Sequence, residues 1–327
     1  MGIEKYFSTG HSRIVIGGRT KALPEYFPSV SSVKTSLSPL EYLKVLTVTK
    51  HPQLLVSAYD LNNSSNKKKM AEITARAMDN GAIILMDSGN YESYWRSDKG
   101  WKWNNYLTAL SKLNFHLAFS FDNQTPPITL SKNILDVERR VARTLKLVPK
   151  ASIIPILHGN LHHLPQIAKQ IVHHLKPVMI AVPERELGEG MIERIGTLTK
   201  IRRTLDETGE DIPLHLLGTG NPLSLLLFSA FGANSFDGLE WCQTTVDHKT
   251  GLLYHLQQRE FFGIQSVFCA NKDIPYAQAT LAHNLMFYSR WMDTIRSHIT
   301  DNKIERLLQT YFLPEFLSTL SAALEEH

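Results

Sequence analysis

Three short apolar segments of this chain each end in a carboxylate. Asp87 follows residues 83–86, Asp122 follows residues 119–121 and Asp237 follows residues 234–236. A barrel of parallel strands carries its chemistry at the carboxyl ends of the strands, so the three acids are expected at one mouth. Carboxylates gathered there suit an acid with a base, a nucleophile with an acid, or a cation site. An Asp after a strand is also a common N-cap of the next helix, so this interpretation depends on all three converging.

Loops after other predicted strands supply polar groups and glycines. They contain His158, Glu184 and the segment Gly218-Thr219-Gly220. Glycine lets backbone N–H groups approach a ligand closely. The Gly-Thr-Gly segment lacks the early position and the following acid of a dinucleotide fingerprint, so we predict no cofactor from it. Aromatic side chains are candidates either for stacking on bases or for covering the barrel rim, namely Trp95, Trp101 and Trp103.

Predicted strands alternate with predicted helices along most of the chain. Strands that are apolar throughout indicate a parallel sheet covered on both faces, and seven or eight such units predict an α/β fold, a (β/α)8 TIM barrel. The eighth strand has two candidates, residues 252–256 and 265–268. We predict one domain over residues 1–327, with 1–35 as an N-terminal ribbon or lid and 277–327 as C-terminal helices. The seven clearer strands are predicted at 54–57, 82–86, 115–119, 152–157, 178–182, 214–217 and 234–237.

Composition sets broad limits on location and partners. The 327 residues carry a formal net charge of +4, which is compatible with a polyanionic partner without requiring one. Two cysteines exclude a disulfide scaffold and fit a reducing compartment. No apolar run approaches the roughly 20 residues that span a bilayer, and the N-terminus has no signal-peptide pattern. The expectation is a cytoplasmic protein without a membrane partner.

A series of short motifs follows in a fixed order along the chain. It consists of Asp87-Ser88-Gly89-Asn90-Tyr91, Phe121-Asp122, Ile156-Leu157-His158-Gly159, Ile180-Ala181-Val182-Pro183-Glu184, Leu216-Leu217-Gly218-Thr219-Gly220-Asn221-Pro222, Phe236-Asp237-Gly238 and Leu281-Ala282-His283-Asn284-Leu285. This ordered set resembles the tRNA-guanine transglycosylase superfamily, which includes related enzymes that insert 7-deazaguanines into DNA. The resemblance runs from about residue 27 to 299. It implies a (β/α)8 barrel that exchanges a guanine in nucleic acid for a 7-deazaguanine base.

The resemblance also implies roles for individual residues. Asp237 would attack the sugar C1′ and hold a covalent nucleic-acid intermediate, while Asp87 would serve as acid and base for the leaving and entering bases. Asp122 would read the purine edge and Tyr91 would stack on it. The target base has to leave its stack to be reached. His158 stands where the family usually has Gln, and the implied substrate pocket is completed by Ser88, Val182, Glu184, Gly218 and Thr219.

Three departures from the family pattern bear on the substrate. The family's structural zinc uses three cysteines and a histidine, but here only Cys269 and His283 stand in that region, so we predict no metal site. Asn90 replaces a Gly, and Gly238 replaces a Cys. The reduced zinc segment favours DNA over tRNA as the substrate, with helper proteins or a homodimer as further partners. A non-catalytic nucleic-acid-binding subunit and an unrelated glycosidase with paired carboxylates remain as alternatives.

Overall fold

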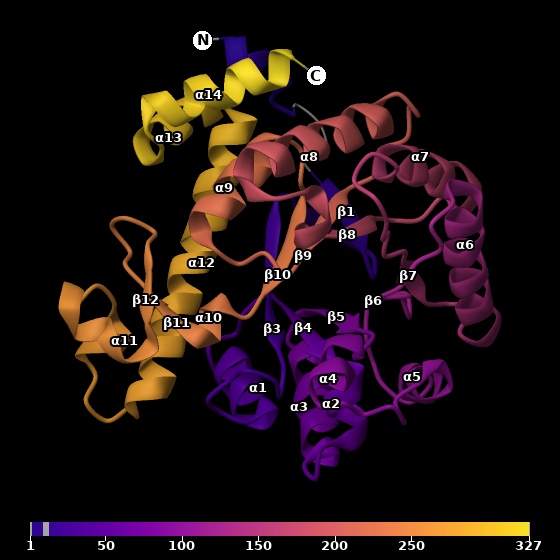
Figure 1. Ribbon diagram of the computed structural model, residues 1–327. Helices are drawn as coiled ribbons and strands as arrows, with labels where there is room; N and C mark the ends of the chain where they lie inside the picture. The colour runs from indigo at the N-terminus through magenta and orange to yellow at the C-terminus, as the bar shows by residue number, and fades with distance from the viewer. Residues whose placement is uncertain (1, 9–12, 327) are drawn as a thin grey trace.

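Eight parallel strands surround a common axis in the computed structural model, which describes residues 2–8 and 13–326 (Figure 1). Their order around the sheet is β7-β6-β5-β4-β3-β10-β9-β8. A parallel bridge between Ile156 and Ala181 joins the chain just after β7 to β8 and closes the ring. This confirms the predicted (β/α)8 barrel. The strands are β3 (Glu25–Val30), β4 (Gln53–Ser57), β5 (Ile83–Asp87), β6 (Leu117–Phe119), β7 (Ser152–Ile154), β8 (Ile180–Pro183), β9 (Leu214–Leu217) and β10 (Ser235–Gly238).

Helices cover the outside of the barrel, and alternate strand residues divide the core into two layers. Inward-facing residues such as Leu55, Leu85 and Phe119 fill the barrel, while their neighbours pack beneath the helices. This is the period of two expected for strands buried on both faces. The helices are α1 (Pro39–Val48), α2 (Ala58–Asn63), α3 (Lys67–Asp79), α4 (Asn90–Trp95), α5 (Trp103–Leu110), α6 (Leu130–Leu147), α7 (Leu164–Leu175), η2 (Glu184–Leu187), α8 (Gly190–Asp206), α9 (Pro222–Ala230) and α10 (Glu240–Gln243).

The eighth strand was predicted in the wrong place. It is β3, which lies between β10 and β4 and falls inside the segment assigned to a ribbon or lid. Of the two candidates, 252–256 supplies β12 (Leu253–His255) of a small antiparallel pair with β11 (Thr244–Val246), and 265–268 leads into the short helix α11 (Val267–Ala270). Pro28 hid the true strand, because proline is unusual in a central strand.

An antiparallel hairpin precedes the barrel, formed by β1 (Arg13–Ile16) and β2 (Arg19–Ala22). Ile14 and Ile16 pack on Phe27 and Ile83, at the ends where the strands begin. The hairpin therefore closes the amino end of the barrel.

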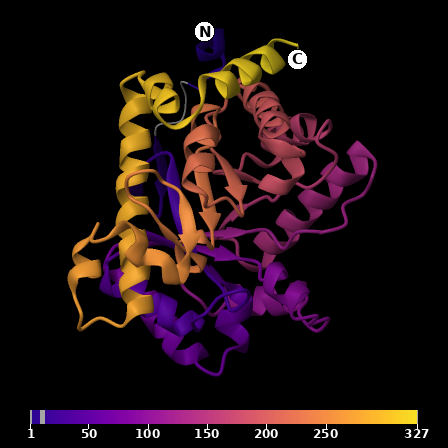
Figure 2. The same cartoon turned by 60° about the vertical axis from the view of Figure 1, so that its left-hand side comes forward.

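The long helix α12 (Tyr276–Thr300) packs along one side of the barrel (Figure 2). Tyr288 stacks on Tyr26 of β3 at 4.6 Å between ring centroids, and the Trp291 indole donates to the Pro222 carbonyl at 2.8 Å. Among residues 2–8 and 13–326, no helix is both long and apolar enough to cross a membrane. The remaining elements are η1 (Gly2–Tyr6), η3 (Leu256–Phe262), α13 (Ile304–Tyr311) and α14 (Pro314–Glu325).

Candidate active site

Asp237 ends β10 and is fixed by groups from both neighbouring strands. Its Oδ2 accepts a hydrogen bond from Ser29 Oγ of β3 at 2.8 Å. Its Oδ1 accepts from the Gly218 backbone N–H at 3.2 Å and lies 3.1 Å from His215 Nε2 of β9. The His215 Nδ1 lies 2.7 Å from Ser235 Oγ, which can donate to it and leave an N–H on Nε2 for Asp237. The carboxylate is thus held in one orientation at the mouth.

Asp87 ends β5 and is half-buried beside other acids. Its Oδ2 accepts from the Gly89 backbone N–H at 2.8 Å. Burial raises the pKa of Asp87 well above its ordinary value, and the negative charges of Glu92, Asp122 and Asp237 raise it further. The protonated form is therefore favoured, and a protonated carboxyl can donate a proton to a leaving group. Because the charges of Asp122 and Asp237 reach Asp87, the three predicted acids lie at one mouth.

Gly89 is required by the turn that carries Asp87. Its φ is +82°, and an added Cβ would lie 2.5 Å from Tyr59 Cβ and 2.8 Å from the Tyr59 backbone nitrogen. Gly89→Ala is therefore expected to lower the free energy of unfolding by about 2–5 kcal/mol, from backbone strain and overpacking together. Chemical denaturation would measure the loss. Gly196→Ala is the control, because its Cβ would meet nothing within 4 Å in helix α8. Equal stability of the two variants would contradict this account.

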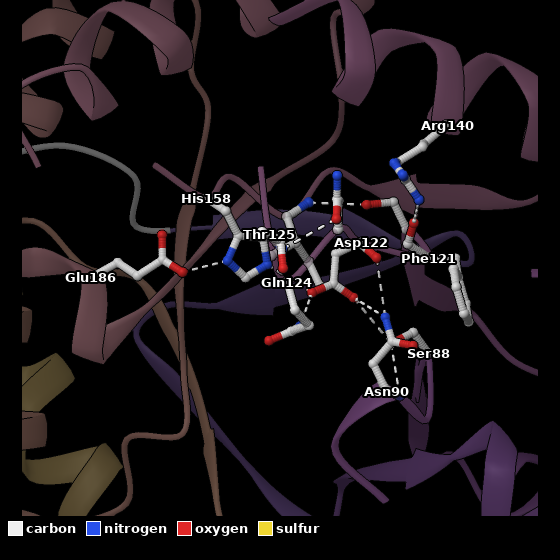
Figure 3. Close-up of polar contacts among 12 residues, drawn as sticks. Ser88, Asn90, Phe121, Asp122, Gln124, Thr125, Arg140, His158 and Glu186 are labelled. Carbon is white, nitrogen blue, oxygen red and sulfur yellow. Dashed lines mark hydrogen bonds and ion pairs between the residues drawn. The ribbon is translucent and has the colours of Figure 1, made fainter. Parts of the chain in front are cut away.

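Asp122 and Glu186 hold His158 between them (Figure 3). His158 Nε2 lies 2.7 Å from Asp122 Oδ2, and its Nδ1 contacts Glu186 Oε1. Burial lowers the pKa of His158, but hydrogen bonds to the two carboxylates outweigh burial and raise it to about 9. For Asp122, burial raises the pKa. The hydrogen bond from His158 and its positive charge lower that pKa by more, so it lies below its ordinary value. Both ring nitrogens are therefore donors, and His158 orients Asp122.

Further donors surround the Asp122 carboxylate. Asn90 Nδ2 donates to Oδ1 at 2.6 Å, Ser88 Oγ lies 3.4 Å from the same oxygen, and Gln124 Nε2 donates to Oδ2. Asn90 thus has a structural role in fixing the acid. Arg185 in turn donates to Gln124 Oε1 at 2.8 Å. A ligand that binds Asp122 has to displace the exposed Gln124.

The ion pair of His158 makes stability depend on pH. Because the folded-state pKa is raised from 6.5 to about 9, its contribution is complete below pH 6.5 and is lost as the pH rises through 9. At 1.36 kcal/mol per pKa unit, the lost contribution is about 3 kcal/mol. Urea unfolding of wild type and His158→Gln should show a gap that is largest near pH 6 and shrinks by about this amount by pH 10. A gap that is constant with pH would contradict the protonated pair.

The remaining predicted residues fall into three groups. Thr219 Oγ1 donates to Glu184 Oε2 at 2.8 Å, and Arg194 pairs with Glu184 Oε1 at 2.6 Å, so this segment is fixed next to the Gly218 backbone. Val182 is fully buried in the layer beneath the helices, so its side chain faces away from the barrel interior. Tyr91 is 38% exposed on α4, beside the mouth.

Sequence reasoning did not assign several residues that touch the predicted site residues. Ser29 and His215 clamp Asp237, and Glu186 pairs with His158. Two more acids lie near the site, Glu92, which is buried, and Glu240, which is half-buried: burial raises the pKa of each to about 7. The one available signal was His215, a polar residue at an inward position of an apolar strand.

The segment around Cys269 and His283 holds a small polar cluster. Cys269 Sγ lies 3.4 Å from His283 Nδ1, and Ser266 Oγ lies 3.1 Å from both atoms. The His248 ring stacks on His283 at 4.0 Å. In the described part of the chain, no three or more His, Cys, Asp or Glu side chains gather as a metal site.

The sequence was also compared with known proteins. No protein-family model matches it, and no curated protein matches it significantly.

Proposed function

We propose that this protein is a guanine transglycosylase that acts on nucleic acid and exchanges guanine for a 7-deazaguanine base. One observation carries the proposal: Asp87, in surroundings that favour its protonated form, faces the same mouth as Asp237, which accepts hydrogen bonds from two adjacent strands. A proton donor and an oriented nucleophile are the two groups that a double displacement at a sugar carbon needs.

The proposed reaction has two steps that balance. In the first, an Asp237 oxygen bonds to C1′, the bond from C1′ to guanine N9 breaks, and the Asp87 proton passes to the guanine. In the second, the entering base gives its N9 proton to Asp87 and bonds to C1′, and the Asp237 ester breaks. The ester between Asp237 and C1′ conserves the free energy of the broken glycosidic bond. That free energy drives formation of the new glycosidic bond, so no cofactor is needed.

Asp122 would recognise the base. A carboxylate accepts two parallel hydrogen bonds from the N1–H and the amino group of guanine, or of a 7-deazaguanine. His158 and Asn90 hold Asp122 for this role, and Tyr91 would stack on the purine face. The exposed amide of Gln124 occupies one carboxylate oxygen until a base arrives.

The choice of DNA rests on the C-terminal segment. The elements β11, β12 and α11 form a short excursion from the barrel, where the tRNA enzymes of the family carry a zinc-bound subdomain for RNA. DNA is therefore the proposed substrate and tRNA the alternative.

Incorporation of labelled guanine tests the activity. Wild-type protein is incubated with labelled guanine and either single-stranded DNA or tRNA, and label in the polymer is counted. Label in DNA above that in tRNA is expected. Asp301→Asn, an exposed acid at the end of α12, serves as a control and should retain full activity. Label in neither polymer would overturn the proposal, and binding without label would point to a non-catalytic subunit.

A further inference from the structure

Helix α4 exposes its aromatic side chains and buries its acid. Tyr91, Tyr94 and Trp95 share one helix face by their spacing and are 38%, 72% and 49% exposed. Glu92 is buried and accepts hydrogen bonds from Ser31 Oγ at 2.5 Å and Ser57 Oγ at 2.8 Å. An ordinary surface helix turns its apolar face to the core and its charged face to water. This reversal marks the exposed face of α4 as a binding surface.

None of the three rings lies flat on another. Trp95 meets Tyr91 at 6.4 Å with an interplanar angle of 66°, and it meets Tyr94 at 5.5 Å with an angle of 84°. Both contacts are edge-to-face, so neither tyrosine ring lies flat on the indole. Rings arranged in this way offer faces on which planar groups can stack.

Positive charge lies directly against these rings. The Lys34 ammonium is 3.5 Å from the centroid of the Trp95 ring. The exposed Arg96 is anchored to the loop that carries Lys34, with Nε 3.2 Å from Ser32 Oγ and Nη2 3.1 Å from the Ser32 carbonyl. Because Glu92 is turned inward, no carboxylate of α4 itself faces these cations. Aromatic faces beside cations suit a partner with stacked rings and negative charge.

The surface adjoins the candidate active site. Helix α4 begins three residues after Asp87, and the Gly89 turn joins them. Tyr91 lies on both the exposed face of α4 and the active-site mouth. The negative charge of Glu240, which itself interacts with Asp237, raises the pKa of the Tyr91 hydroxyl group. A chain whose target nucleotide enters the mouth would therefore run over α4.

We infer that Tyr94, Trp95, Lys34 and Arg96, which together with Tyr91 form the α4 surface, bind the unpaired nucleotides next to the target base. The inference rests on the proposed function, since it takes the target to be a nucleotide. An unpaired strand fits because its bases have free faces, whereas a duplex presents only base edges and phosphates. The bases would stack on Trp95 and Tyr94, and Lys34 and Arg96 would meet the phosphates.

Binding of a fluorescently labelled oligonucleotide, followed by anisotropy, tests the inference. Wild-type protein should bind unpaired DNA or RNA more tightly than a duplex of the same sequence. Trp95→Ala should weaken binding of the unpaired strand roughly ten-fold, the loss expected for one stacked base. Lys34→Ala should reduce the slope of log affinity against log salt by about 0.7. Arg143→Ala is the matched control, because Arg143 covers Trp103 at 3.6 Å in the same way, on α6.

Each outcome separates the α4 surface from the proposed reaction. If wild type exchanges bases and Trp95→Ala binds the oligonucleotide as tightly as wild type, the inference about the α4 surface is overturned and the proposed reaction is retained. If Trp95→Ala binds more weakly but wild type shows no exchange, the inference about the α4 surface is supported and the proposed reaction is overturned. Equal losses in Trp95→Ala and Arg143→Ala, or no nucleic-acid binding by wild type, would also overturn the surface.

Discussion

Replacing Asp237 with Asn is expected to abolish base exchange, with a loss of at least about 10⁴-fold in rate. The amide has nearly the shape of the carboxylate, and its single oxygen can still accept from the Gly218 N–H while its NH2 group donates to the Ser29 hydroxyl, but it is a far weaker nucleophile. Removing a nucleophile costs most of the enzymatic acceleration, because the covalent route closes. Single-turnover incorporation of labelled guanine measures the loss.

The Asp237→Asn result needs a check that the fold survives. His215 and Ser29 fix position 237, so thermal unfolding of the variant should be compared with that of wild type and of Asp301→Asn. A folded Asp237→Asn protein with exchange within ten-fold of wild type would remove Asp237 as the nucleophile.

Replacing Asp87 with Asn is expected to slow exchange by about 10²- to 10⁴-fold while raising stability at neutral pH. The loss of rate follows because the amide cannot pass a proton to the leaving guanine. The gain in stability follows from the pKa of Asp87, which burial and neighbouring charges raise well above its ordinary value. An acid with a raised folded-state pKa stabilises the fold less as the pH rises above its unfolded-state pKa. Asn has no charge to bury and escapes this cost.

The two effects of Asp87→Asn are measured separately. Rates with labelled guanine should fall, and the melting temperature at pH 8 should rise by more than at pH 4. Gains in melting temperature that are equal at both pH values would contradict the raised pKa. Unchanged rates would remove Asp87 as the acid.

Local pattern was enough to predict the barrel, except for one strand. Apolar runs that end in an acid located β5 and β10, because a strand buried on both faces is apolar throughout. Strand β3 escaped because of Pro28. The register explains how proline is tolerated: Pro28 is the last β3 residue paired with β10, and pairing with β4 begins at Ser29. This change of pairing partner along β3 becomes visible only in the closed barrel.

The sequence was enough to predict which side chains stand at the ends of strands, but not which side chains from other strands contact them. Asp87, Asp122 and Asp237 could be chosen because each follows its own strand. Their partners come from other strands and loops, such as His215 beside Asp237 and Glu186 beside His158. Contacts of this kind depend on barrel register, which a single sequence does not contain.

Trapping a covalent adduct tests the central claim most directly. Wild-type protein is incubated with labelled single-stranded DNA or labelled tRNA, denatured and run on a gel. The account predicts a labelled protein band with DNA that is absent from Asp237→Asn and disappears when excess guanine is added, because guanine reverses the ester. An adduct that survives in Asp237→Asn, or no adduct with either nucleic acid, would contradict it.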